Sequence, residues 1–240
     1  MQYVAFSGGK DSTAMALALR ERGEIFEMIY TPTGNELPGM QEHIDRVAGI
    51  VERRLHRLRA PTLVELIHRW SALPNWRQRY CTRLIKIEPC KAFLIAHPSS
   101  TLCVGFRADE EIRQGLYGGY ARYRYPLREL GWKLADVFEC LQRHRMTVPR
   151  RTDCALCYGQ RLSEWWRLWA DYRTEFEAGV ELERICGHTF RSAQRDSWPA
   201  SLSDLQAEFE VGRVPRGADQ QYLPFEEDLS TYGACRICRM

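Results

Sequence analysis

Short apolar runs alternate with longer amphipathic segments along the first half of the chain. Residues 2–6, 24–30 and 101–106 have the composition of buried strands. Residues 13–20, 40–58, 62–70 and 87–96 carry apolar side chains at the spacing typical of a helix. The order strand, helix, strand, helix predicts an α/β fold, in which a parallel sheet is flanked by helices.

The pattern changes near residue 148. Residues 134–143 are predicted as a helix that ends before Val148 and Pro149. Beyond them the chain is rich in cysteine, tryptophan and arginine, with helical spacing at 162–180 and again at 202–209, where Ser201 or Ser203 is a suitable cap. We therefore expect an α/β domain over residues 1–148 and a mainly helical, cysteine-rich module over residues 149–240.

Composition narrows the class of protein only a little. The 240 residues are 45% hydrophobic and 27% charged, as in an ordinary globular protein. A net charge of +3 permits a polyanionic partner but is weaker than the charge of a dedicated nucleic-acid binder. No apolar run reaches about 18 residues and no signal-peptide pattern follows Met1, so we expect a cytoplasmic protein without a membrane partner.

A polar loop lies between the first strand and the first helix. Its residues are Ser7, Gly8, Gly9, Lys10, Asp11 and Ser12. Free amides and the helix dipole make such a junction a site for anions, and glycine lets the backbone approach a phosphate closely. Asp11 is expected to orient the loop or to help hold Mg²⁺. The spacing is not that of a Walker A loop, and a glycine turn with a polar helix cap is the alternative.

Further segments follow in order along the chain. They are Thr-Pro-Thr-Gly-Asn-Glu-Leu-Pro at 31–38, Arg-Tyr-Cys-Thr at 79–82 with Lys-Ile-Glu-Pro at 86–89, Gly-Phe-Arg-Ala-Asp-Glu-Glu-Ile-Arg at 105–113, and Tyr-Pro-Leu at 125–127 with Asp-Val at 136–137. With the polar loop, this series resembles the PP-loop adenine nucleotide alpha hydrolases, specifically the branch of phosphoadenylylsulfate (PAPS) reductases and related ATP pyrophosphatases. The segment around Cys81 is similar to that of DNA phosphorothioation proteins, whereas Pro32 and Thr33 depart from the branch's Asp-Thr-Gly pattern.

The resemblance spans roughly residues 1–160 and implies a Rossmann-like sheet with an adenine nucleotide, ATP or adenylylsulfate or PAPS, across its carboxyl edge. It implies that the nucleotide also contacts Thr33, Gly34, Lys86, Arg107 and Arg113. Arginine suits phosphate or sulfate because its planar fork donates two parallel hydrogen bonds. For any one of these cations, a solvated surface charge is the alternative. The candidate catalytic residues are Lys10, Asp11, Arg107 and Cys81.

Two Cys-x-x-Cys pairs indicate a metal site. Cys154 and Cys157 form the first pair, Cys235 and Cys238 form the second, and 77 residues lie between the two pairs. Structural disulfides are not expected in a reducing compartment. Four thiolates suit tetrahedral Zn²⁺ and serve equally for a [4Fe-4S] cluster. Because the interval is much longer than in a compact zinc ribbon, such a site would clamp the end of the chain onto the second module. Four buried or free cysteines are the alternative.

Cys81 leaves the choice of metal open. In iron–sulfur members of the resembled branch, a Cys-Cys pair before the Lys-x-x-Pro segment joins a later Cys-x-x-Cys to hold the cluster. Tyr80 stands at the first position of that pair here, so a cluster on Cys81, Cys154 and Cys157 requires a fourth ligand from Cys235 or Cys238. If zinc takes both pairs, Cys81 remains a thiol near the phosphates.

These features predict an enzyme that binds ATP with Mg²⁺, activates an acceptor by adenylylation and releases pyrophosphate, in sulfur transfer or nucleic-acid modification. A sulfur donor protein, a nucleic-acid substrate and a second copy of the chain are the further partners considered. One alternative is an adenylylsulfate or PAPS reductase, although the branch's Glu-Cys-Gly-Leu-His motif is missing. Another is a non-catalytic nucleotide-binding subunit of a modification complex. The stripe of Trp165, Trp166 and Trp169 is predicted to pack in the core rather than to stack on nucleic acid.

Overall fold

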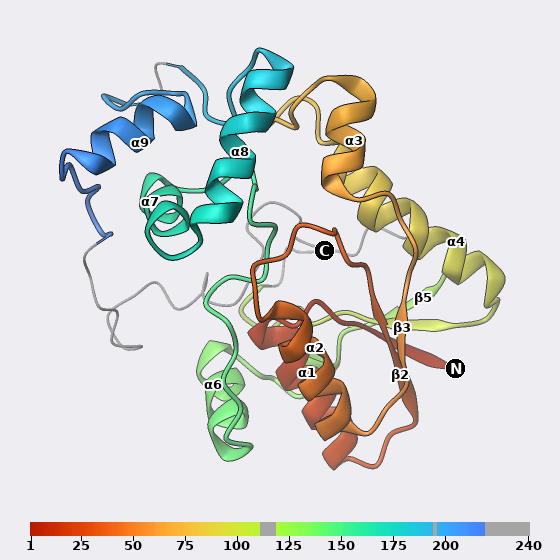
Figure 1. The fold of residues 1–240 in the computed structure, drawn as a ribbon. Coiled ribbons are helices and arrows are strands. Elements are labelled where there is room, and N and C mark those ends of the chain that lie inside the picture. Colours follow the sequence, from red (N-terminus) through yellow and green to blue (C-terminus); the bar gives the residue numbers. More distant parts are fainter. Residues whose placement is uncertain (111–118, 194–195, 219–240) are drawn as a thin grey trace.

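The computed structural model describes residues 1–110, 119–193 and 196–218 (Figure 1). Within them, five strands form one sheet in the order β3-β2-β1-β4-β5, and every neighbouring pair is parallel. The strands are β1 (Gln2–Ala5), β2 (Phe26–Tyr30), β3 (Leu55–Arg57), β4 (Thr101–Cys103) and β5 (Arg122–Arg124). Strand order reverses at β1, so a crevice is expected between the loops that follow β1 and β4.

Helices cover both faces of the sheet, because alternate residues of each strand point to opposite sides. Val4 and Met28 pack with α1 (Lys10–Glu21), α2 (Met40–Val51) and α6 (Leu134–Arg143) in one cluster. Tyr3 and Leu102 pack on the other side with α4 (Glu88–Ala96). The four-residue helix α5 (Pro126–Glu129) follows β5.

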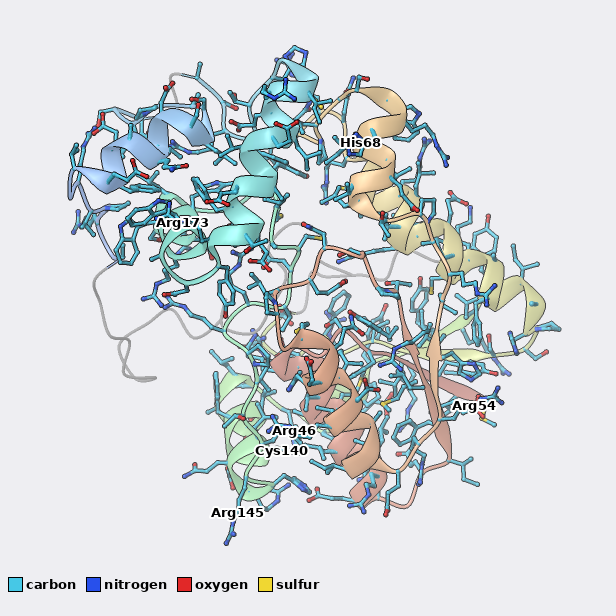
Figure 2. All side chains as sticks on the ribbon, in the orientation of Figure 1. Arg46, Arg54, His68, Cys140, Arg145 and Arg173 are labelled. Carbon is cyan, nitrogen blue, oxygen red and sulfur yellow. The ribbon has the colours of Figure 1, made fainter. Side chains whose placement is uncertain are left out.

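Contacts between segments that are distant in sequence join α1, α2 and α6 in the cluster that contains Val4 and Met28. The Sγ atom of Cys140 on α6 lies 3.9 Å from the carbonyl oxygen of Ala14 on α1. Arg46 on α2 donates to the carbonyl oxygen of Thr147 over 2.9 Å. Figure 2 shows Arg46 and Cys140 in the region where α1, α2 and α6 meet. The helix α6 and the residues after it, up to Thr147, are thereby packed onto the same face of the sheet as α1 and α2.

The C-terminal part is mostly helical and carries cysteines. Its helices are α7 (Leu162–Asp171), α8 (Arg173–Cys186) and α9 (Leu202–Glu210), the last capped by Ser201. They share a core centred on Trp165 and Phe176 with α3 (Leu63–Trp70) and with the π-helix η1 (Thr82–Ile87). No helix among the described residues is long and apolar enough to cross a membrane.

The α/β prediction with a parallel sheet is confirmed, but three of the predicted elements are wrong in extent. The helix predicted over 40–58 ends at Val51, because Glu52 adopts a left-handed conformation (φ 55°) and residues 55–57 then pair with β2. The strand predicted over 101–106 ends at Cys103. The helix predicted over 162–180 is divided at Tyr172, whose backbone (φ −137°, ψ 62°) is not helical.

The tryptophan stripe packs inward, as the spacing predicted. Trp165 is fully buried, and Trp166 and Trp169 pack against the same cluster. The guanidinium of Arg173 lies 4.5 Å from the centre of the Trp169 ring, and Figure 2 marks this arginine beside α7. These rings therefore serve the core of the C-terminal part.

Candidate functional site

The loop between β1 and α1 has a left-handed conformation at Gly8, which favours glycine. Its φ is +74°, and a Cβ there would lie 2.5 Å from Cε of Met40 and 2.6 Å from Cδ1 of Ile44 on α2. The Ser12 hydroxyl accepts from the Ser7 amide over 3.3 Å and donates to the Gly9 carbonyl over 3.1 Å. The amides of Asp11 and Ser12, in the first turn of α1, have no acceptor among the described residues. Such amides form an anion site.

Asp11 joins two cations at this helix start. Its Oδ2 lies 2.8 Å from Nζ of Lys10, which is fully buried, and its Oδ1 accepts from Nη1 of Arg107 over 2.9 Å. Asp11 therefore orients the two cations, which is one of the two roles expected for this carboxylate. Each of its oxygens keeps a second lone pair, so a role as a Mg²⁺ ligand stays a prediction.

The Arg107 side chain is buried and forms pairs with several carboxylates. It is only 4% exposed, and Nε also donates to Oδ1 of Asp109 over 2.9 Å. Burial lowers the pKa of Arg107, but its pairs with Asp11, Glu110 and Asp109 outweigh burial and keep the pKa above its ordinary value. The guanidinium is therefore a fixed positive charge beside the start of α1.

Gly105 brings the end of β4 against the same helix start. A Cβ at this position would lie 3.3 Å from the carbonyl carbon and oxygen of Asp11 and 3.3 Å from the Ser12 nitrogen. Two backbones therefore touch where strand order reverses, between β1 and β4. In open α/β sheets, ligands bind at this position on the carboxyl edge.

His43 fixes the loop from the side of α2. Its Nε2 lies 2.9 Å from the Gly8 carbonyl oxygen, and the side chain is buried. Burial lowers the pKa of His43 more than the bond to Gly8 raises it, so the neutral ring predominates near pH 7. Because a carbonyl oxygen only accepts, Nε2 carries the proton and donates.

The loop after β2 meets the first cysteine pair. Sγ of Cys154 lies 3.3 Å from Oγ1 of Thr33, and Asn35 accepts through its carbonyl oxygen from the Ala155 amide over 2.7 Å. Gly34 has φ +67°, and a Cβ there would lie 2.4 Å from Cγ2 of Thr62, the residue that caps α3. The cysteine pair is thus attached to the loop that contains Thr33 and Gly34.

The segment around Cys81 and Lys86 lies beside that loop. Cys81 precedes η1 and packs against the cluster that also contains Cys154 and Cys157. Lys86 interacts with Tyr30 at the end of β2, where burial raises the pKa of the phenol and the ammonium partly offsets this rise. Within the described residues, no three His, Cys, Asp or Glu side chains are placed to hold a metal ion.

The structure therefore brings the polar loop and Arg107 together, and it places Thr33, Gly34 and Lys86 at the neighbouring strand end. Arg113, Cys235 and Cys238 lie outside the described residues. Sequence reasoning missed His43, and it included Gly105 in a motif without predicting its contact with the loop, because nothing near these residues in sequence shows that contact. Glu110 was not among the predicted site residues, and its carboxylate accepts from the Arg107 amide over 3.2 Å.

The fold and this site define a Rossmann-like protein with a candidate anion site at the carboxyl edge of its sheet. Residues 2–116 match the family model of the phosphoadenosine phosphosulfate reductase domain. This match agrees with the resemblance to the PAPS reductase branch of the PP-loop proteins that the sequence motifs predicted.

Solved structures share the fold. PAPS reductase from Candida auris, in a phosphate complex, is 14% identical and has a TM-score of 0.52, over 61% of this chain and 74% of that one. The U34-tRNA thiolase NcsA from Methanococcus maripaludis, solved with its [4Fe-4S] cluster, is 13% identical with a TM-score of 0.50, over 99% of this chain and 78% of that one.

Among curated proteins, the uncharacterized protein MJ0973 of Methanocaldococcus jannaschii is 21% identical over 222 residues. The match covers 84% of this chain but only 53% of the relative. The chain thus spans about half the length of the curated relative that it matches.

Proposed function

We propose that this protein binds ATP, or a close adenylyl relative, at the carboxyl edge of the sheet and transfers the adenylyl group to an acceptor. One observation carries the proposal: the first-turn amides of α1, the buried ammonium of Lys10 and the fixed guanidinium of Arg107 converge where strand order reverses. Three kinds of hydrogen-bond donor for a polyphosphate therefore lie together at the carboxyl edge of the sheet.

The reaction that suits these groups is displacement at the α-phosphorus. A nucleophile on the acceptor forms a bond to this phosphorus, the bond to the bridging oxygen of the β-phosphate breaks, and pyrophosphate leaves with the electron pair. Negative charge grows on the leaving phosphates, and fixed donors stabilise it without reorganising. Lys10, Arg107 and the loop amides would supply this stabilisation, and Asp11 would keep both cations in position.

The domain family and the named neighbours support a function connected with sulfur. One neighbour is named as a reductase of an adenylylated sulfate and the other as a tRNA thiolase. The proposed adenylyl transfer would then prepare an acceptor for the addition of sulfur, or would serve the modification of a nucleic acid. We include in this proposal a sulfur donor protein as a partner and a second copy of the chain in a homo-oligomer.

A PAPS reductase activity is the second candidate, favoured by the family model over residues 2–116. It requires a cysteine thiolate that attacks the sulfur of the substrate, so that the nucleotide phosphate leaves and a thiosulfonate forms. A thiol reductant then attacks the cysteine sulfur and releases sulfite, and a disulfide remains. Cys81 is the cysteine proposed for the site. It is only partly buried, at the beginning of η1.

The decisive experiment compares the two substrates on the full chain. Protein is incubated with ATP and Mg²⁺, with and without candidate acceptors, and in parallel with PAPS and a thiol reductant, while pyrophosphate and sulfite are both measured. Pyrophosphate from ATP supports adenylylation, and sulfite from PAPS supports the reductase. Nucleotide binding without either product identifies a non-catalytic subunit.

Two lysine variants, one inside and one outside the proposed site, test nucleotide binding. Lys10→Ala is expected to abolish nucleotide binding measured by calorimetry, because it removes the buried ammonium beside Asp11. Lys91→Ala, on α4, removes a lysine that forms a pair with Glu88 and is expected to bind like the parent protein. Equal binding by parent and Lys10→Ala protein would contradict the site.

We also propose two modules, residues 1–148 and 149–240, with a metal bound by Cys154, Cys157, Cys235 and Cys238. The large cluster behind α1 includes Val148 and no residue after it, which supports this boundary. The donor set of thiolates fits Zn²⁺ or a [4Fe-4S] cluster, which would supply a structural clamp or a sulfur-linked redox centre. Attachment of the first pair to the loop of Thr33 would put this metal beside the nucleotide.

A further inference from the structure

One stretch of the chain has a charge unlike the rest. Between Glu65 and Glu88 it contains Arg69, Arg77, Arg79, Arg83 and Lys86 and no aspartate or glutamate, although the whole protein has a net charge of only +3. Arg77 and Arg83 form no ion pair with any described residue, and both are exposed. His68 of α3, labelled in Figure 2, lies in the same stretch and is also exposed.

The same stretch contains a pocket of about 530 Å³. This volume lies within the range of small-ligand sites, roughly 300–1,000 Å³, and accommodates a nucleobase with its sugar. We call it the arginine–tryptophan pocket. Its lining consists of Trp70, Ala72, Gln78, Arg79, Tyr80 and Arg83. The lining therefore combines guanidinium groups, an amide and aromatic rings, without a carboxylate.

The aromatic rings of this stretch are held in place and remain accessible. The Trp70 and Tyr80 rings meet edge to face, with centroids 4.6 Å apart, and the Tyr80 hydroxyl donates to the Ala72 carbonyl over 2.5 Å. The Trp76 and Tyr158 rings also meet edge to face, with centroids 5.3 Å apart. Trp70 is still 43% exposed and Trp76 58% exposed. Large exposed tryptophans on a fixed framework are typical of recognition surfaces.

We propose that the arginine–tryptophan pocket binds single-stranded nucleic acid, with one base inserted against Trp70 and the adjoining phosphates on Arg79 and Arg83. Aromatic faces for stacking and cations for the backbone are the two requirements of single-strand binding. A duplex hides its bases, so it would use the cations alone. Gln78 adds an amide that can donate to and accept from a base edge.

The pocket is close to the proposed nucleotide site along η1. Arg83, in the pocket, and Lys86, beside Tyr30, are three residues apart on this helix. A strand bound in the pocket would thus present its neighbouring nucleotides toward the carboxyl edge of the sheet. The binding claim itself does not depend on the proposed reaction, because it requires no ATP.

The test measures binding of a fluorescein-labelled 12-nucleotide single-stranded DNA, and of the corresponding duplex, by anisotropy at several salt concentrations without ATP. Trp70→Ala is expected to weaken single-strand binding roughly 10-fold or more, and Trp70→Phe to restore most of the loss, because a stacking face returns. The double variant Arg79→Ala/Arg83→Ala is expected to reduce the slope of log affinity against log salt by roughly 1.4, at about 0.7 for each phosphate contact.

Two control variants separate this site from general charge and from the nucleotide site. Arg184→Ala removes an exposed arginine of α8 and is expected to bind the strand like the parent protein. Lys10→Ala is expected to keep strand binding even when it loses ATP. The inference is overturned by absence of strand binding, by a duplex bound as tightly as the single strand, or by Trp70→Ala binding like the parent. If the pocket instead bound an acidic protein, single-stranded DNA binding would be absent.

Discussion

His43 on α2 donates a hydrogen bond from Nε2 to the carbonyl oxygen of Gly8, 2.9 Å away, across a separation of 35 residues. Gly8 is also the residue whose missing side chain lets Met40 and Ile44 approach the loop. One helix therefore sets both the position and the conformation of the loop that begins α1. The polar loop is pre-organised by its neighbour rather than by its own sequence alone.

Replacing His43 tests whether this bond supports nucleotide binding. His43→Ala leaves the buried Gly8 carbonyl without its donor, which costs about 1–3 kcal/mol, and we expect ATP affinity to fall about 10-fold. His43→Gln retains a donor at a similar reach and is expected to restore most of the affinity. Calorimetric titration with ATP measures both. If the alanine variant binds as tightly as the parent, His43 is only a packing residue.

Gly8→Ala separates crowding from backbone strain. Its Cβ would meet Met40 and Ile44 at 2.5 and 2.6 Å, and its φ is +74°. Gly23→Ala is the matched control, because Gly23 has φ +68° but no atom within 4 Å of an added Cβ. Strain at positive φ alone costs about 1 kcal/mol, whereas the clash adds about 1–3 kcal/mol. Chemical denaturation should therefore find Gly8→Ala clearly less stable than Gly23→Ala, and equal stabilities would contradict the packing described.

Arg107→Ala removes the fixed cation beside α1. We expect a loss of about 2 kcal/mol of unfolding free energy, because Asp11 keeps Lys10 but loses its second partner in a buried position. Nucleotide binding should weaken in parallel. Arg143→Ala breaks an exposed, solvent-screened pair with Glu21 and should lower the stability much less. Thermal melting compares the two, and a larger effect at Arg143 would refute this account of the cluster.

Metal content tests the cysteine proposal. Cys154→Ser and Cys157→Ser should each reduce bound metal to background, because a site loses affinity steeply when a thiolate is replaced. Cys186→Ser is the control, since Cys186 packs against the same cluster but belongs to neither pair. Elemental analysis of anaerobic preparations gives zinc or iron, and a broad absorption in the blue accompanies a cluster. Metal retained in the Cys154 variant would exclude that residue as a ligand.

Glu183 should make stability depend on pH. Burial raises the pKa of this carboxyl from 4.5 to about 7, although it accepts from the Phe190 and Leu202 amides over 2.8 and 2.7 Å. A carboxyl whose pKa is raised by folding contributes stability below pH 4.5, and this contribution is lost as the pH rises through about 7. The loss amounts to roughly 3 kcal/mol at most.

Glu183→Gln removes this titration, so its unfolding free energy should change less between pH 5 and pH 8 than that of the parent. Glu181→Gln, at an exposed position of the same helix, should leave the pH profile between these values unchanged. Denaturation curves at several pH values measure both. Parallel profiles for parent and Glu183→Gln protein would mean that Glu183 is already ionised at pH 5.

Some elements were predictable because they depend on nearby residues. The helix at 134–143 was found with its observed bounds, and the cap of α3 at Thr62 agrees with the predicted start. The strand β3 was missed, since Leu-His-Arg continues the amphipathic pattern of α2 and becomes a strand only by pairing with β2. β5, with two arginines in three residues, is likewise a strand through its pairing with β4.

The sequence by itself determined the strands β1, β2 and β4, the helices between them and the glycine-containing loop at the start of α1, because these follow from local conformational preference and hydrophobic periodicity. Only the tertiary structure decided that His43 and Gly105 meet this loop, that Cys154 lies against Thr33, and that Trp70 remains accessible. Contacts across tens of residues depend on which faces of the sheet the helices cover, and no local pattern encodes that choice.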